Sequence, residues 1–194
     1  NKAIETAQET KEESIDFLFM AGETLKQQQH YREALVMYLR VNEAASTSQN
    51  LRSMGVCIAG MATCYRELGN LDKALPLARR AVEMIPITQN YSHGAAALLE
   101  LANCEFESNL NSAALQHALL SYNTYSEAKH KVGSANATAL LVSLYEAQGN
   151  YRKALEYSEL RYKYQSQVER QQSNRQLAFG EFSRDNAAKT ARRE

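Results

Sequence analysis

The cysteines and histidines are the side chains of this sequence best suited to metal or redox chemistry. Cys57 and Cys64 are seven residues apart and Cys104 follows Cys64 by forty, so no Cys-x-x-Cys pair is present. Three thiols cannot all pair within one chain, and we interpret them as buried small apolar residues. The histidines lack metal-ligand spacing, so we expect no metal site and no cofactor. We place them at the surface or at helix caps: His30, His93, His117 and His130.

Motifs for catalysis, nucleic-acid binding and membrane insertion are also missing from the sequence. There is no glycine-rich phosphate loop, no Gly-x-Ser-x-Gly elbow and no nucleophile paired with a base. Lys plus Arg and Asp plus Glu each number 22, which argues against a binder that depends on a basic surface. No apolar run approaches 18 residues. We therefore expect no enzyme activity, no nucleic-acid partner and no membrane contact within this chain.

The sequence contains a repeat, and the elements of this repeat must position any binding surface of the chain. The dipeptide Ala-Leu recurs every 40 residues, at 34–35, 74–75, 114–115 and 154–155. Just before two of the copies stand Gly69-Asn70 and Gly149-Asn150, which indicate a helix end followed by an N-cap. Gln29-His30 and Asn109-Leu110 are weaker signals at the equivalent places. Each unit thus reads as helix, tight turn, helix, and a fixed period of this length is typical of stacked repeats.

The pattern resembles the tetratricopeptide repeat (TPR). The second copy matches best, with Ala62, Tyr65, Gly69-Asn70, Ala74, Ala78, Ala81 and Pro86, whereas the third has Glu105 where the family has Tyr. The resemblance implies an all-α, TPR-like superhelix of four helix-turn-helix repeats of about 40 residues, with a long C-terminal helix. We expect a TPR-like domain over 1–166, with repeats at about 15–54, 55–94, 95–134 and 135–166, and a C-terminal helix over 167–194.

Several packing expectations follow from the repeat. The family unit is about 34 residues, so the surplus here must lengthen the helices or the links; 46–50 and 87–90 look like links. Pro76 lies inside a predicted helix and should kink it. Five tyrosines fall at repeat-packing positions, where we expect them to be core: Tyr31, Tyr38, Tyr65, Tyr145 and Tyr151.

In TPR arrays the first helix of each pair lines a concave groove, and this resemblance selects the candidate binding residues. Aligning the repeats puts an apolar row beside a polar row, which suits an extended peptide or an amphipathic helix. Alternatively these residues face solvent, or the chain's own terminal helix fills the groove. The candidate partner-binding residues are Phe19, Glu23, Thr63, Arg66, Leu99, Asn103, Phe106, Ser143 and Glu146.

The tail carries a second resemblance. Its residues 162–168, Arg175-Gln-Leu177 and Phe182 look like the segment that follows TPR repeats in bacterial signalling proteins with diguanylate cyclase (GGDEF) or histidine kinase outputs. That resemblance implies the start of a signalling helix or coiled coil. In the other interpretation this helix caps the repeats and packs Leu177 and Phe182 on the last one. An unpaired tail would favour a homodimer through Leu177, Phe179 and Phe182.

The leading functional hypothesis is a non-catalytic protein- or peptide-binding TPR module, the sensory input region of a larger bacterial signalling protein. The alternatives are a stand-alone scaffold or assembly adaptor, and a peptide-pheromone-responsive regulator. Both ends look cut from a longer chain, so any catalytic output domain would lie outside it. The compartment is open: cytoplasmic, or the periplasmic side of the inner membrane if the cyclase resemblance holds.

Overall fold

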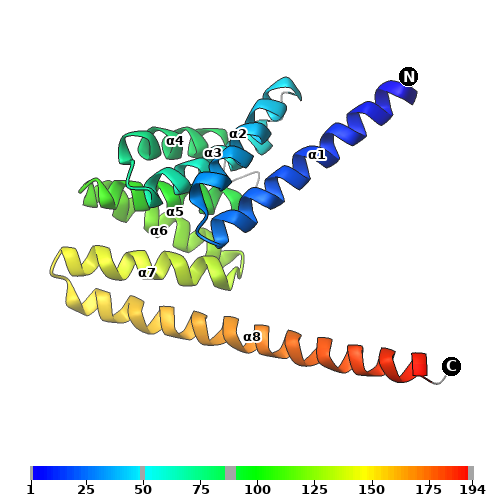
Figure 1. The fold of residues 1–194 in the computed structure, drawn as a ribbon. Coiled ribbons are helices and arrows are strands. Elements are labelled where there is room, and N and C mark those ends of the chain that lie inside the picture. The colour runs from blue at the N-terminus through cyan, green and yellow to red at the C-terminus, as the bar shows by residue number, and fades with distance from the viewer. Residues whose placement is uncertain (1, 49–50, 86–90, 192–194) are drawn as a thin grey trace. The chain divides into compact units, whose positions relative to one another are not determined.

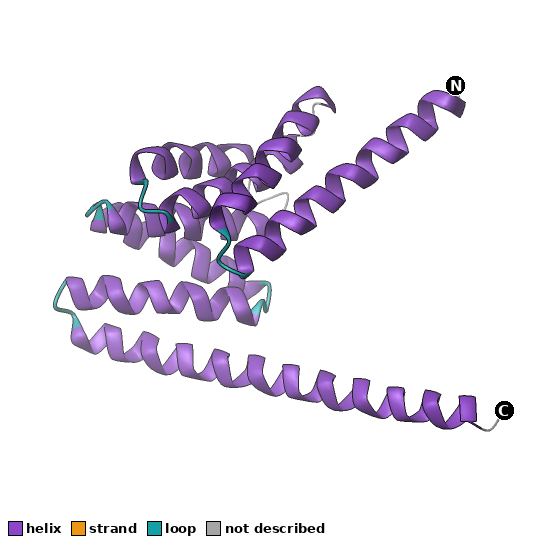
Figure 2. Cartoon of the chain, viewed as in Figure 1, coloured by secondary structure: helices purple, strands orange, loops and turns teal. Residues whose placement is uncertain are grey.

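The computed structural model describes the backbone of residues 2–48, 51–85 and 91–191. This part of the chain consists of helices and short turns without a strand (Figure 2). No helix in it is both long and apolar enough to cross a membrane. The helices are α1 (Lys2–Gln27), α2 (Tyr31–Ser48), α3 (Leu51–Glu67), α4 (Leu71–Met84), α5 (Tyr91–Glu107), α6 (Asn111–Glu127), α7 (Lys131–Ala147) and α8 (Tyr151–Ala191) (Figure 1).

The helices belong to two compact units. Unit 1 spans Asn1–Ala128 and holds α1 to α6; unit 2 spans Lys129–Glu194 and holds α7 and α8. In unit 1 each helix packs on the next, and the first helices of the pairs also meet, since α1 contacts α3 and α3 contacts α5. In unit 2, α7 and α8 form one helical hairpin. The chain is therefore all-α with a TPR-like arrangement of hairpins.

All four turns inside the hairpins have the same geometry. The second residue after the end of the first helix adopts a left-handed conformation, and the N–H of the following residue bonds the carbonyl five residues back, at 2.8–2.9 Å. Gly69 and Gly149 take this conformation easily, with φ of 74° and 71°, but Gln29 and Asn109 take it too, with φ of 63° and 60°. The turns predicted from Gly-Asn are confirmed, and the weak signals mark the same turn.

Asparagine completes two of these turns as an N-cap. The Asn70 Oδ1 accepts from the Lys73 N–H and the Asn150 Oδ1 from the Lys153 N–H, each at 3.3 Å. Leu110, at the equivalent place in the third hairpin, makes no side-chain cap. Two of the hairpins thus begin their second helix with the cap that the sequence predicts.

The core of unit 1 is built around Tyr38, which is completely buried. Its ring lies against Gly60, where an added Cβ would come within 2.6 Å of the ring Cζ, and against Gly22, where the nearest ring carbon would be at 3.0 Å. The alanines of the Ala-Leu pairs are also buried, from Ala34 at 0% to Ala154 at 5% exposure. Small residues therefore let the paired helices approach closely, as the repeat predicts.

Some local expectations were wrong. Tyr151, expected in the core, is 72% exposed, because it starts α8 and unit 2 holds only α7 to cover that helix. Residues 46–48, expected in a link, are the last residues of α2, while 49–50 and the expected link at 87–90 lie outside the described residues. Pro76 lies inside α4, as expected, and the kink expected there stays a prediction. The α8 helix is continuous across position 166, and the domain boundary placed there stays a prediction.

Candidate functional site

The candidate binding residues lie on the first helices of the hairpins, as the register predicts. In unit 1 seven of them are half-buried, neither in the core nor fully exposed. We call this set the candidate face: Phe19 and Glu23 on α1, Thr63 and Arg66 on α3, and Leu99, Asn103 and Phe106 on α5. Unit 2 carries the other two on α7, where Ser143 is half-buried and Glu146 is exposed. Their role in binding is still a prediction.

Arg66 is held by three carboxylates. Its Nε lies 2.8 Å from the Glu100 Oε1, its Nη1 2.8 Å from the Glu107 Oε1, and its Nη2 2.7 Å from the Glu67 Oε1. Burial alone lowers the pKa of Arg66, but these carboxylates more than offset it, so the pKa is raised and the guanidinium stays charged. Arg66 therefore joins α3 to α5 and is not a free recognition group.

Glu100 is the buried partner in this cluster, and sequence reasoning missed it. Burial raises the pKa of its carboxyl, and the Arg66 charge and hydrogen bonds from Arg66 and Cys104 work in the other direction. The Cys104 Sγ lies 3.6 Å from its Oε1. No repeat signal points to Glu100, because the residue 40 positions earlier, Gly60, serves a different purpose, the close approach of Tyr38.

Glu23 is also partnered within unit 1. Its Oε1 accepts hydrogen bonds from the Tyr38 hydroxyl at 2.6 Å and from the Lys26 ammonium at 2.7 Å. The Lys26 Nζ lies 5.9 Å from the centre of the Tyr38 ring, which Phe19 meets at a tilt of 55°. Burial raises the pKa of the Tyr38 hydroxyl, and the Glu23 hydrogen bond adds to this, so it stays a donor. The α1 end of the face is thus a preformed network.

The remaining polar candidate residues differ in their hydrogen bonds. The Thr63 hydroxyl donates to the Ala59 carbonyl at 3.2 Å, and the Ser143 hydroxyl donates to the Ala139 carbonyl at 3.5 Å. Asn103 makes no hydrogen bond in the described part of the chain. Leu99, Asn103 and Phe106 are spaced four and three residues apart, so they share one side of α5. This stripe thus places an amide without a hydrogen bond in the described residues between two half-buried apolar side chains.

A second pair was also missed, inside the α5–α6 hairpin. Glu105 is 3% exposed, and its Oε2 lies 2.7 Å from the His117 Nδ1. We expected His117 at the surface or at a cap, and that was wrong: it is half-buried and bonded across the hairpin. The signal was present in the sequence, since Glu105 replaces the repeat tyrosine and a buried carboxylate requires a partner.

The thiols and histidines do not form a reactive centre. All three cysteines are free and buried, as predicted. Burial raises the pKa of Cys57 to about 12 and that of Cys64 to about 11, and it also raises the pKa of Cys104, so the thiols stay protonated. Among the described side chains, no group of three or more His, Cys, Asp or Glu residues is arranged to hold a metal ion. One histidine caps a helix: the His130 Nδ1 accepts from the Gly133 N–H at 3.0 Å.

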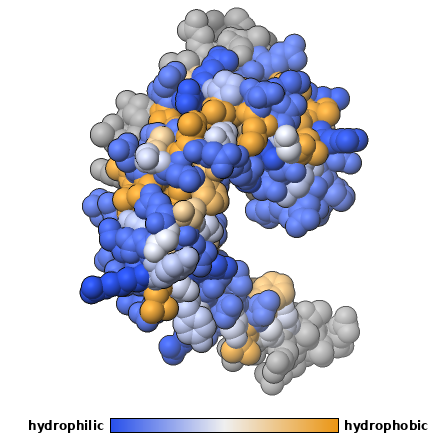
Figure 3. Space-filling view, turned by 90° about the vertical axis from the view of Figure 1, so that its left-hand side faces the viewer, coloured by the Kyte–Doolittle hydropathy of each residue, from blue (hydrophilic) through white to orange (hydrophobic). Residues whose placement is uncertain are grey.

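The tail of α8 leaves its apolar residues in solvent. Leu177, Phe179 and Phe182 are 65%, 71% and 63% exposed. The interpretation in which Leu177 and Phe182 pack on the last repeat is therefore wrong, because α8 has 41 residues and α7, its only neighbour in unit 2, has 17. On the face of the molecule shown in Figure 3, hydrophilic residues predominate and hydrophobic ones gather in patches.

Residues 59–88 match the tetratricopeptide repeat family. The fold is TPR-like. The match covers α3 from Ala59, its turn and α4, which is the copy with the most family residues. No curated protein sequence matches this chain significantly.

Solved structures share the TPR-like fold at low sequence identity. Aspartyl phosphate phosphatase F from Bacillus subtilis aligns over 80% of this chain and 41% of its own length, with 15% identity and a TM-score of 0.70. BtubC from P. vanneervenii aligns over 80% and 64%, with 10% identity and a TM-score of 0.66. The apo form of RapI aligns over 88% and 76%, with 17% identity and a TM-score of 0.59. This chain thus spans less than two thirds of the first two proteins, and these similarities give no support to the diguanylate cyclase or histidine kinase resemblance.

Proposed function

We propose that this chain is a non-catalytic module that binds a protein or peptide through the candidate face. The observation that carries the proposal is the stripe of Leu99, Asn103 and Phe106 on α5. Two half-buried apolar side chains flank an amide that makes no hydrogen bond in the described part of the chain. Such a stripe suits a peptide whose apolar side chains pack on Leu99 and Phe106 while its backbone bonds Asn103.

The neighbouring charges support this assignment. The Arg66 cluster fixes α3 against α5, and the Glu23 network fixes the α1 side, so the stripe lies on a surface that is ordered before a ligand arrives. A preorganised surface loses less entropy on binding than a flexible one. Repeat folds of this type commonly present such surfaces and rarely contain catalytic centres.

Panning a random-peptide phage library against chain 1–194 tests the proposal. Enriched peptides are then titrated into the wild type, into Leu99→Arg/Asn103→Arg, and into a matched control, Leu120→Arg/Asn123→Arg, whose residues are exposed on α6. We expect the α5 variant to bind at least about tenfold more weakly, the equivalent of about 1.4 kcal/mol, and the control to bind normally. No enrichment, or equal losses in both variants, would contradict the proposal.

We further propose that the module is the sensory input region of a larger signalling protein of the bacterial type. The support is α8, which continues well past α7 and presents Leu177, Phe179 and Phe182 to solvent. Ligand binding would shift the repeat packing, and α8, alone or as a homodimer through these residues, would carry the shift outward. If the output of the full-length protein is unchanged in Leu99→Arg/Asn103→Arg, the sensor proposal fails while the binding proposal can still hold.

The scaffold and the peptide-responsive regulator give different results in the same assays. A scaffold binds a partner through the face without any change in α8, whereas a regulator responds to a short peptide. The fold likeness to an aspartyl phosphate phosphatase is the observation that keeps the regulator as second candidate. Loss of both binding and regulated phosphatase output in Leu99→Arg/Asn103→Arg would favour it over the sensor.

A further inference from the structure

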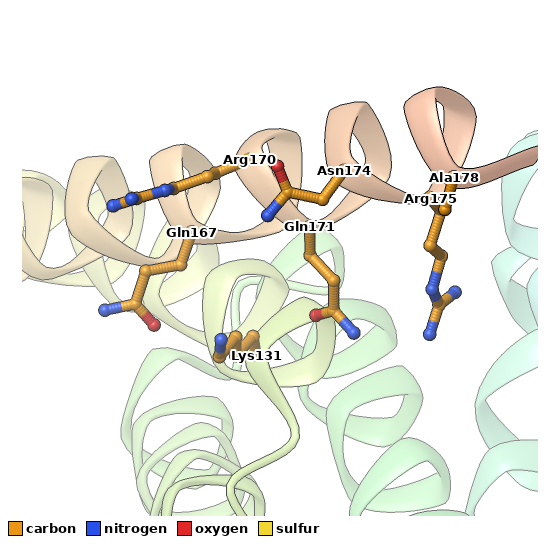
Figure 4. A pocket seen from close by; sticks show the side chains of 7 residues that line it. All are labelled: Lys131, Gln167, Arg170, Gln171, Asn174, Arg175 and Ala178. Carbon is orange, nitrogen blue, oxygen red and sulfur yellow. The ribbon is translucent and has the colours of Figure 1, made fainter. Parts of the chain in front are cut away.

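Unit 2 contains an open cleft lined by basic and amide side chains. Two adjoining cavities, of about 580 Å³ and about 480 Å³, share Lys131 at the start of α7 with Gln171 and Arg175 on α8. Arg170 lines one of them and Lys129 the other. Figure 4 shows Gln171 and Arg175 extending from α8 on the side where Lys131 lies. We call this the basic cleft: Lys129, Lys131, Gln167, Arg170, Gln171, Gln172, Asn174 and Arg175.

The positive charge of the basic cleft is uncompensated within the part of unit 2 that the structure describes. None of its four Lys and Arg side chains forms an ion pair with a described residue, in contrast to Arg66, which has three. Glu169, the one acidic residue of α8 between positions 160 and 180, lines neither cavity. Four unpaired cations at one place favour a ligand that brings several carboxylates.

Charge is divided between the two units of the chain. Unit 1 has ten Lys and Arg against fifteen Asp and Glu, and unit 2 has twelve against seven, so the net zero charge conceals an acidic and a basic half. The acid is concentrated at the N-terminus, where residues 1–16 hold five Asp and Glu against two Lys. Glu5, Glu9, Glu12 and Asp16 are spaced four, three and four residues apart within α1, the spacing of a single helix face.

We propose that the basic cleft binds residues 2–16, the acidic segment of α1, in a second copy of this chain. Carboxylates at helical spacing would pair with the cations, and the cleft's glutamine and asparagine amides would bond the helix surface between them. The partner is a protein segment rather than a nucleic acid, because the acidic unit 1 would repel a polyanion and no Phe, Tyr or Trp ring lines the cleft for base stacking. The contact is head-to-tail, so each bound copy still offers a free segment or cleft and copies join into chains or rings.

Sedimentation velocity of chain 1–194 over a wide concentration range tests the proposal. We expect larger species as concentration rises, and their loss when salt is raised from about 0.1 M to about 1 M, which shortens the Debye length from about 10 Å to about 3 Å. A chain that stays monomeric at every concentration, including one that docks the segment on its own cleft, overturns the proposal.

Charge reversal identifies the contact. The cleft variant is Lys131→Glu/Arg170→Glu/Arg175→Glu, and the segment variant is Glu5→Lys/Glu9→Lys/Glu12→Lys. Each alone should weaken self-association at least about tenfold, and an equimolar mixture of the two should associate again with both variants in equal amounts. The native segment of the cleft variant would pair with the native cleft of the segment variant, and the two charge-reversed sites would pair with each other. The chain with both sets of reversals should self-associate again, which a merely misfolded variant could not do.

A matched control is Arg161→Glu/Lys163→Glu, which reverses two exposed charges on α8 outside the cleft. It should associate as the wild type does. Self-association that survives the cleft variant, for example through Phe179 and Phe182 of α8, overturns the proposal, and so does a mixture that forms no complex.

Discussion

The Arg66 guanidinium on α3 lies 2.8 Å from the Glu100 carboxylate on α5, with both side chains largely buried. This ion pair links the first helices of two successive hairpins and lies beside the stripe proposed to bind a ligand. Removing one partner of a buried ion pair lowers the stability of the fold strongly, because the charge that remains has no counter-charge in a site with little water. The rigidity of the candidate face therefore depends on it.

Removing Arg66 alone should destabilise the chain strongly. In Arg66→Met the Glu100 carboxyl either stays charged without its partner or takes up a proton, and we expect a loss of about 3–5 kcal/mol in the free energy of unfolding. Urea denaturation measures it. The double variant Arg66→Met/Glu100→Leu should lose less than the single one, because no charge is left unpaired.

The control for this prediction is the exposed pair of Arg152 and Glu156, whose closest atoms are 3.5 Å apart with Arg152 92% exposed. Arg152→Met should leave stability unchanged, since water screens such pairs. Equal losses in Arg66→Met and in the double variant would mean that the pair is not the cause.

Replacing Gly60 by alanine should destabilise the chain, whereas the same replacement at Gly180 should not. A Cβ on Gly60 would meet the Tyr38 ring at 2.6 Å, and that ring is fixed by complete burial and by its bond to Glu23. We expect Gly60→Ala to cost about 1–3 kcal/mol. Gly180 has no atom within 4 Å of its added Cβ, so Gly180→Ala should stabilise α8 by up to about 1 kcal/mol. Thermal unfolding followed by circular dichroism shows whether the signs differ as predicted.

The turn residues offer a stabilising substitution. Gln29 adopts φ of 63°, which costs an L-residue about 1–2 kcal/mol that glycine avoids. Gln29→Gly should therefore raise the free energy of unfolding by about 1 kcal/mol, and Gly149→Ala, at the equivalent turn with φ of 71°, should lower it by a similar amount. Chemical denaturation of both variants is the check; a destabilising Gln29→Gly would show that the side chain contributes more than the strain costs.

The raised pKa of the buried Cys64 thiol predicts how the free energy of unfolding falls at alkaline pH. The folded pKa of Cys64, about 11, is above the ordinary value of 9.0, so the folded state holds a proton that the unfolded state releases. The contribution of the protonated Cys64 thiol to the free energy of unfolding is thus complete below pH 9 and is lost as pH rises toward 11. Comparing wild type with Cys64→Ala cancels the other groups that titrate there, and the wild type should lose about 1.4 kcal/mol more per pH unit in that window. Parallel pH profiles for the two proteins would exclude this assignment.

The sequence predicts the hairpins well because their signals are local and repeated. Gly69-Asn70 and Gly149-Asn150 identify the turn chemistry, and the 40-residue period then locates the same turn at Gln29 and Asn109, whose own side chains indicate it only weakly. The half-burial of Leu99, Asn103 and Phe106 follows from the same register. Features that depend on a single repeat can therefore be predicted from the sequence.

Contacts between elements escaped prediction because they do not follow the period. Arg66 and Glu100 are 34 residues apart, and their meeting depends on how α3 and α5 pack. Lys131 and Arg175 come from different helices and share a cleft because α8 extends beside the start of α7. Tyr151 matched the repeat pattern, but exposure depends on neighbours, and unit 2 supplies only α7.

The central claim is that a peptide binds on the α5 stripe, and an amide NMR map of chain 1–194 tests it most directly. A peptide enriched by panning is titrated into labelled protein, and the shifted signals are placed on the structure. We predict the largest shifts at Leu99, Asn103 and Phe106, with smaller ones around Arg66. Shifts that centre on the basic cleft of unit 2, or on the exposed end of α8, would contradict it.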